Sequence, residues 1–312
     1  QLLLGAFPPV LVEKFAAEME THPLKAEIIA TKLANMLVND MGANFVQRMM
    51  EETGSSVSEV AISYAIARDL FDLPGIWSKL EALDTAIPAE LQTRLLFQLR
   101  RTMRRVTRWF LRHRNKALSI ADTVEFFKPA LSRVSEKLDT LLARAEADSL
   151  ALYAQKLQEQ QVPAEVARYM AQLSTVFSVM DIAQVAAAEQ ADLLLVAEIY
   201  FKLGDKLDLH WFLEQITQQP VANHWQALAR ASYREELDWQ QRALAQVVVH
   251  SCNGNCIADD VVASWLVAND AILARWRLML AEFKTTKSHE FAKFSVALRE
   301  LMLLSHHCDS VK

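Results

Sequence analysis

Apolar residues recur every three or four positions along almost the whole chain, the spacing of the buried side of amphipathic helices. The clearest example lies within residues 88–113, where one helix face collects Leu95, Leu99, Met103, Val106 and Phe110. No segment shows the two-residue alternation of a half-buried strand. The β-branched run at 247–250 only ends a helical pattern. The pattern therefore predicts an all-α protein.

Capping and breaking residues give the expected helix ends. Ser56 and Glu59 have the spacing of a capping box, and Gly42 and Gly54 follow apolar stretches as stop signals. Helices are expected over 24–41, 45–53, 57–71, 88–113, 129–160, 163–177, 223–249, 259–283 and 287–304, with shorter ones over 181–216. This predicts an irregular multi-helix bundle of about twelve helices in two packed lobes. We place the lobe boundary in the polar break after His113, which gives residues 1–116 and 117–312.

The composition agrees with a helical protein and indicates the cellular compartment in which it is expected. The 312 residues include only 6 glycines and 8 prolines, few for the turns of a β protein. Three cysteines indicate a reducing compartment, and we expect a cytoplasmic location. No apolar run reaches the roughly 18 residues of a membrane span. The segment "QLLLGAF" lacks the basic region of a signal peptide, and a chain that starts at Gln1 suggests a piece of a longer protein.

Arginine is concentrated in "RRTMRRVTRWFLRHR", residues 100–114, although the chain has a net charge of -5. On a helix, one narrow stripe about 140° from the apolar face collects Arg94, Arg101, Arg105, Arg108 and Arg112. No acidic residue occurs between Glu90 and Asp122. The counter-charges of this stripe must therefore come from elsewhere.

Three interpretations of the stripe compete. Nucleic-acid binding would use it for phosphates, but the chain is acidic and offers no aromatic stacking platform beside it. A membrane-surface helix needs bulky apolar residues for the bilayer, and here the apolar face has the pattern of a protein core. We favour arginines paired with acids of neighbouring helices or of another domain, which makes the stripe a candidate interdomain or subunit surface. No nucleic-acid or membrane partner is expected.

A second candidate is a group of polar residues within an apolar region. It comprises Asn35, Asn39, Arg48, Glu52, Arg68 and Asp69. Asn35 and Asn39 share a helix face. We favour a buried polar network that fixes helix register over a docking surface, and both interpretations stay open.

Two further segments suggest specific chemistry. "HSCNGNC" supplies His250, Cys252 and Cys256, with His306, His307 and Cys308 near the C-terminus as further candidate ligands, but the spacing is not that of a zinc knuckle. Small residues within 181–204 have the spacing that is typical of a helix-turn-helix. The second half of this segment is too apolar to contact base edges, so it is expected to pack inside a bundle.

Sequence motifs of catalysis and cofactor binding are missing. The chain has no G-x-G-x-x-G after a strand, no Walker lysine loop, no G-x-S-x-G and no HExxH. We therefore predict no catalytic, cofactor-binding or metal-ligating residue and no cofactor within these residues.

Five long stretches are distinctive when taken together: "FPPVLVEKFAAEMETHPLKAEIIATKLANMLVNDMG" (7–42), "EETGSSVSEVAISYAIARDLFDLPGIWSKLEALD" (51–84), "LQTRLLFQLRRTMRRVTRWFLRHR" (91–114), "VAEIYFKLG" (196–204) and "HWQALARASYREELDWQQRAL" (224–244). They resemble the C-terminal region of the very large bacterial NAD-specific glutamate dehydrogenases. The resemblance covers most of the chain in the right order and is weakest from "CNGNC" to the end.

The resemblance implies a helical region that follows a regulatory N-terminal region and a dehydrogenase core. The whole enzyme would oxidise L-glutamate to 2-oxoglutarate and ammonia while reducing NAD. Its substrate lysines, catalytic aspartate and glycine-rich cofactor loop lie in the core and have no matching position here. The implied partners are the core of the same chain and identical subunits, with a role in core stability, assembly or allosteric regulation. The alternatives are a stand-alone helical scaffold or adaptor that binds protein or nucleic acid, and an independent metalloprotein.

Overall fold

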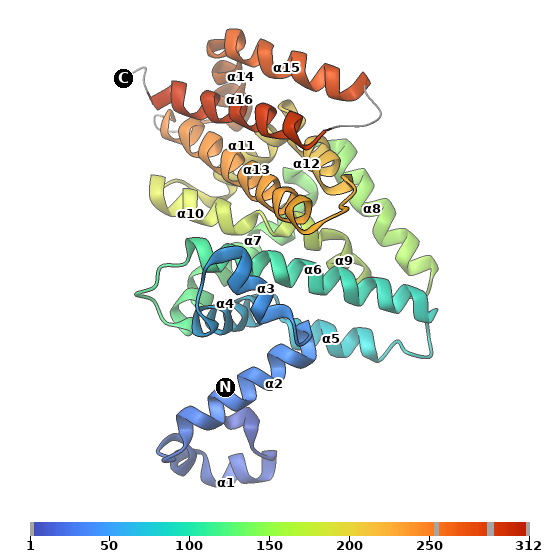
Figure 1. The fold of residues 1–312 in the computed structure, drawn as a ribbon, viewed down its shortest axis with the longest axis vertical. Helices are drawn as coiled ribbons and strands as arrows, with labels where there is room; N and C mark the ends of the chain where they lie inside the picture. The colour runs from blue at the N-terminus through green and yellow to red at the C-terminus, as the bar shows by residue number, and fades with distance from the viewer. Residues whose placement is uncertain (1–2, 253–255, 286–289, 310–312) are drawn as a thin grey trace. The chain divides into compact units, whose positions relative to one another are not determined.

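The computed structural model describes residues 3–252, 256–285 and 290–309. Within these ranges the chain forms sixteen α-helices and one short 3-10 helix, with no strand (Figure 1). The all-α prediction is confirmed. The expected number of about twelve helices was too low, because the expected segments 129–160 and 259–283 each form two helices and residues 9–20 form a helix that was not expected.

The chain packs as two compact units. Unit 1 comprises residues 1–128 and 153–177, and unit 2 comprises residues 129–152 and 178–312. The chain passes into unit 2 within helix α7 (Ile120–Leu141), returns within α8 (Arg144–Glu159) and passes again after Phe177. The lobe boundary after residue 116 stays a prediction.

Unit 1 is built from seven complete α-helices, the 3-10 helix and parts of α7 and α8. The complete elements are η1 (Leu4–Ala6), α1 (Pro9–Glu20), α2 (Lys25–Met41), α3 (Phe45–Thr53), α4 (Val57–Leu70), α5 (Leu73–Glu81), α6 (Ala89–His113) and α9 (Ala164–Val176). The predicted capping box opens α4, where the Ser56 side chain accepts from the Glu59 amide. Gly54 ends α3 at a φ of 70°, the left-handed conformation that glycine adopts without strain.

The core of unit 1 lies between α6 and its neighbours. The five residues predicted on the apolar face of α6 are all at most 1% exposed, which confirms that prediction. Helix α4 packs along α6 and contributes the buried Tyr64 and Ile66 (Figure 1). At the end of α6, Phe127 meets Trp109 and Phe110 edge-on, with ring centroids 5.6 and 5.5 Å apart. Burial of this face holds α6 in place, so its arginines project from a fixed helix.

Unit 2 contains the remaining helices and parts of α7 and α8. The complete ones are α10 (Val179–Glu189), α11 (Leu193–Lys206), α12 (Leu209–Gln218), α13 (His224–His250), α14 (Ala258–Ala268), α15 (Asp270–Thr285) and α16 (Phe291–Asp309). Helices α13 and α16 run side by side (Figure 1). The buried residues of α11 include Val196, Ile199 and Tyr200, so this segment packs inside the bundle as predicted.

An aromatic cluster forms the centre of unit 2. The ring of Phe212 lies 5.3 to 5.6 Å, centroid to centroid, from the rings of Trp276, Phe283 and Phe294. The buried indole Nε1 of Trp276 donates to the Leu207 carbonyl at 3.0 Å. The indole nitrogen is thus buried in the core together with its hydrogen-bond acceptor.

Two expected helices, 129–160 and 259–283, differ in the structure. The first is divided between Leu141 and Arg144 into α7 and α8, and it also begins earlier than expected. Helix α7 was expected to start at Pro129 but starts at Ile120, where Ser119 and Asp122 form a reciprocal cap. Pro129 therefore lies inside the helix. The expected helix 259–283 is divided at Asn269, whose side chain donates to the Trp265 carbonyl and ends α14. A short polar side chain that hydrogen-bonds backbone competes with helix propagation, and the apolar periodicity alone does not reveal this.

Candidate interdomain surface

The arginines of the predicted stripe on α6 have different partners in the structure. Arg108 is ion-paired with Glu52 of α3. The Arg105 guanidinium lies 3.7 Å from the ring centroid of Phe177. Arg101 and Arg112 are exposed, and Arg112 takes part in further interactions. The arginine-rich helix therefore obtains a counter-charge and a ring face from segments distant in sequence.

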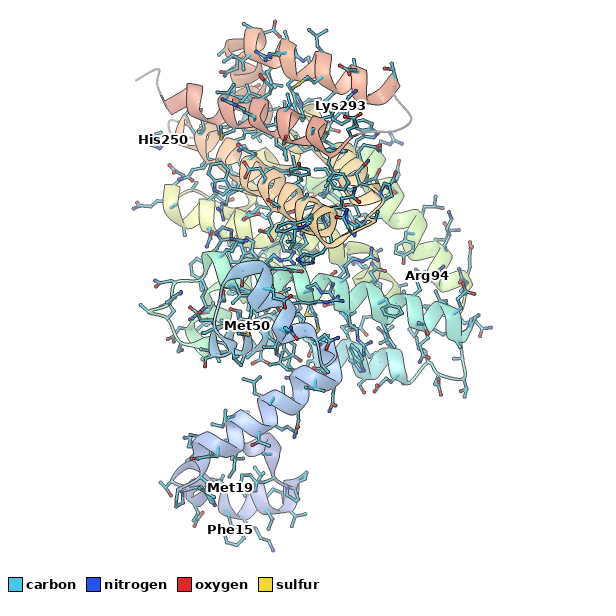
Figure 2. All side chains as sticks on the ribbon, in the orientation of Figure 1. Phe15, Met19, Met50, Arg94, His250 and Lys293 are labelled. Atoms are coloured by element: carbon cyan, nitrogen blue, oxygen red, sulfur yellow. The ribbon has the colours of Figure 1, made fainter. Side chains whose placement is uncertain are left out.

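Arg94 lies near the N-terminal end of α6 and is exposed (Figure 2). Its charge acts on Tyr153 of α8, where burial raises the pKa of the phenol and Arg94 opposes that rise. The Tyr153 hydroxyl donates to Gln98 Oε1 at 3.1 Å, and the Gln98 amide donates to the Met170 carbonyl at 2.8 Å. These bonds connect α6 with α8 and α9 below the arginine.

The predicted polar group is divided in the structure. Asn35 and Asn39 are exposed on α2, one turn apart, and Arg48 is exposed on α3. Glu52 pairs with Arg108, whereas Arg68 pairs with its neighbour Asp69, with 3.4 Å between Nη1 and Oδ1. The structure thus brings Glu52 and Arg68 into two separate pairings and leaves the asparagines facing solvent.

Asp40 of α2 is a polar centre that sequence reasoning did not identify. The Tyr64 hydroxyl donates to Asp40 Oδ2, and the Arg68 guanidinium lies 3.7 Å from the same oxygen. The Arg100 Nε donates to the Asp40 carbonyl at 2.8 Å, while its guanidinium lies 5.0 Å from the centroid of Trp77. Burial, then the bond to Asp40, raises the pKa of Tyr64, so the phenol stays protonated. Asp40 and Tyr64 lie 24 residues apart on α2 and α4, so the periodicity of neither helix indicates this contact.

The N-terminal helices expose apolar side chains that sequence reasoning also missed. Leu11 and Phe15 lie four residues apart on α1 and are 42% and 47% exposed, and Val10 and Leu24 are also exposed. We call these four residues the N-terminal apolar segment. Figure 2 places Phe15 at the outer edge of α1. The backbone at Phe15 is not helical (φ -131°, ψ 25°), so α1 bends there. An exposed group of this kind is typical of a protein contact surface.

Cys252 and Cys256 follow α13 in the sequence. The Cys252 thiol has a pKa raised to about 11 by burial and by its neighbour Cys256, so it is not a reactive thiolate at neutral pH. His250 contacts Glu189, with 2.8 Å between Nδ1 and Oε2. In the described ranges, no three His, Cys, Asp or Glu side chains are placed to hold one metal ion. The side chains of His306, His307 and Cys308 are not among those that the structure describes.

No single helix in the described ranges is long and apolar enough to cross a bilayer. Of these helices, only the bent pair α9 and α10, taken together, has sufficient length and hydropathy.

Comparison with known proteins identifies relatives over nearly the whole chain. The family model described as glutamate dehydrogenase, C-terminal, matches residues 1–303. The NAD-specific glutamate dehydrogenase of Pseudomonas aeruginosa is 41% identical over 300 residues, which cover 96% of this chain and 18% of the relative. Proteins with the same name from Halomonas elongata and Mycobacterium tuberculosis are 37% and 26% identical. They too are matched over 18% of their own length. The chain therefore belongs to the family of glutamate dehydrogenase C-terminal regions.

Proposed function

We propose that these residues are a non-catalytic helical region of a large, cytoplasmic NAD-dependent glutamate dehydrogenase. The parent reaction would convert L-glutamate, NAD and water into 2-oxoglutarate, ammonia and NADH. The observation that carries this proposal is the family match over residues 1–303 combined with the 18% of the relatives' length that the chain spans. NAD and glutamate would bind in the remaining part of such an enzyme.

The role of the region would be to support the catalytic core of the same chain, with identical subunits as a second contact. The N-terminal apolar segment is the surface that best fits contact with the core. A partner that covers Leu11 and Phe15 would be bound more tightly, because each Å² of apolar surface removed from water contributes about 25 cal/mol of favourable free energy. More than four fifths of the length of the relatives lies outside the matched region. In such a protein the remaining part of the same polypeptide would be the partner that covers this segment.

A truncation experiment tests the supporting role. Glutamate-dependent NAD reduction is measured for this chain alone, for the full-length enzyme and for the enzyme truncated before this region. We expect the chain alone to be inactive and the truncated enzyme to lose activity, regulation or assembly while its core stays folded. A truncated enzyme with normal rate, regulation and oligomeric state would refute the support role. Turnover by the chain alone would refute its non-catalytic nature.

Surface substitutions test the proposed contact itself. In the full-length enzyme, Leu11→Ser and Phe15→Ser are combined, and the control combines Val267→Ser with Leu278→Ser, which are 78% and 72% exposed in unit 2. Substitutions at exposed positions usually change folding stability by no more than about 0.5 kcal/mol. We expect reduced activity or altered assembly for the first variant alone. Equal behaviour of both variants would remove the N-terminal apolar segment from the proposal.

A further inference from the structure

Three arginines of unit 1 are carried by two helices, α3 and α6, that contact each other. Arg101 and Arg104 are one turn apart on α6, and Arg48 lies on α3. The ion pair between Glu52 and Arg108 joins the same two helices. Arg48 precedes Glu52 by one turn, and Arg104 precedes Arg108 by one turn. Arg100 contacts the Asp40 carbonyl just before α3, and Arg108 pairs with Glu52 near the end of α3, so the two helices run in the same direction. Arg48 therefore lies one turn before this ion pair, on the side of Arg104, and its charge acts on Arg104.

Arg104 is the central member of this group. Its side chain is partly buried, and its Nε is shielded from solvent without a hydrogen-bond partner among the described residues. Burial, together with the charges of Arg48 and Arg101, lowers the pKa of Arg104. Across the part of the chain that the structure describes, none of these three arginines forms an ion pair. The neighbours on α6 differ, since Arg108 pairs with Glu52 and Arg105 covers Phe177.

A partly desolvated cation beside two like charges is unfavourable unless an anion joins them. The guanidinium group has a planar set of donors that matches phosphate and carboxylate oxygens in a bidentate manner. A single carboxylate would balance only one of three positive charges. A dianion balances more of them, and its several oxygens can accept from Arg104 and from both exposed arginines.

We propose that Arg48, Arg101 and Arg104 form a binding site for a small multivalent oxyanion, which carries either a phosphate group or a pair of carboxylates. This site goes beyond the proposed function and does not depend on it. It lies on α3 and α6, apart from the N-terminal apolar segment on α1. Asp40 and Glu52, which belong to neighbouring contacts, are already engaged by Arg68 and Arg108.

Calorimetric titration of the 312-residue chain tests the site. Inorganic phosphate and malonate are titrated separately, with sodium chloride at matched ionic strength as the reference. We expect at least one of the two oxyanions to bind, and Arg104→Gln to weaken that binding by about tenfold or more, since a charge-assisted bond is lost. The control is Arg144→Gln. This side chain is 95% exposed, and its Nε lies 3.8 Å from Asp148 Oδ2. This control should bind as the original chain does.

A second variant separates loss of the site from loss of folding. Arg48→Glu places a carboxylate beside Arg104, so it should abolish oxyanion binding while the thermal midpoint stays equal or rises. Binding of phosphate but not malonate would assign a phosphate ligand, and the reverse would assign a dicarboxylate. The proposal is overturned if neither oxyanion binds the original chain, or if Arg104→Gln and Arg48→Glu bind as well as the original chain.

Discussion

The guanidinium of Arg108 on α6 is ion-paired with the carboxylate of Glu52 on α3, and the two side chains are only 14% and 22% exposed. Residues 91–121 contain no acid, so this counter-charge comes from a distant part of the sequence. Partial exclusion of water strengthens the attraction between the two charges and makes the loss of either one costly. The pair thus fixes α3 against the arginine-rich helix.

Glu52→Gln should destabilise the chain by about 1–3 kcal/mol, because Arg108 would lose its charged acceptor on α3. The measurement is urea unfolding followed by far-ultraviolet circular dichroism. Glu51→Gln is the matched control, since the exposed Glu51 accepts, among the described residues, only from Gln47, at 2.9 Å. Equal unfolding midpoints for the two variants would contradict the importance of the pair.

The capping box of α4 should give a pH-dependent stability. Glu59 has a pKa lowered from 4.5 to about 2, first by the Lys116 ammonium and then by the Ser56 amide and hydroxyl. Folding therefore favours the ionised carboxylate, so this stabilisation is complete above the unfolded pKa near 4.5 and disappears as pH falls toward 2. The difference in unfolding free energy between the original chain and Glu59→Gln should shrink over this range.

Lys116→Met provides the control for that pH profile. Because Lys116 is the largest cause of the lowered pKa, this variant should retain the cap with a weaker pH dependence. A constant difference between the original chain and Glu59→Gln from pH 6 to pH 2.5 would show that Glu59 does not stabilise the fold through its charge.

Trp276→Phe tests the centre of unit 2. The substitution removes the donor to the Leu207 carbonyl and leaves space beside Phe212, so we expect a loss of about 2–3 kcal/mol. Thermal and urea unfolding give the value. Trp225→Phe, at a residue that is 77% exposed, should change stability by less than about 0.5 kcal/mol. A comparable small change for both variants would argue against the aromatic cluster as the core.

Arg242→Met tests the buried ion pair of unit 2. Arg242 Nη1 lies 3.3 Å from Asp181 Oδ1, and the aspartate side chain is 2% exposed. Removing this cation leaves the buried carboxylate of Asp181 without its charged partner, so the free energy of unfolding should fall by about 3–5 kcal/mol. Arg133→Met is the control, because the Arg133–Asp192 pair is more than half exposed and contributes about 1 kcal/mol or less. A loss for Arg242→Met as small as that control would contradict the prediction.

The sequence by itself determined the all-α class, most helix ends and the buried face of α6. These features depend on interactions within about one helical turn, such as the Ser56–Glu59 cap, and on the periodic separation of apolar from polar residues. The family resemblance, from stretches distributed along the chain, is confirmed by the comparisons. Helix breaks at Asn269 and the early start at Ser119 were missed, because short polar side chains compete for the backbone there.

Only the tertiary structure decided which charges meet. The stripe on α6 was visible in the sequence, but its partners Glu52 and Phe177 come from α3 and from the residue after α9. The network around Asp40 and the group formed by Arg48, Arg101 and Arg104 also join residues from different helices. Helical periodicity gives the side of a helix on which a residue lies. It does not give the neighbouring helix, because that choice depends on how whole apolar faces pack together.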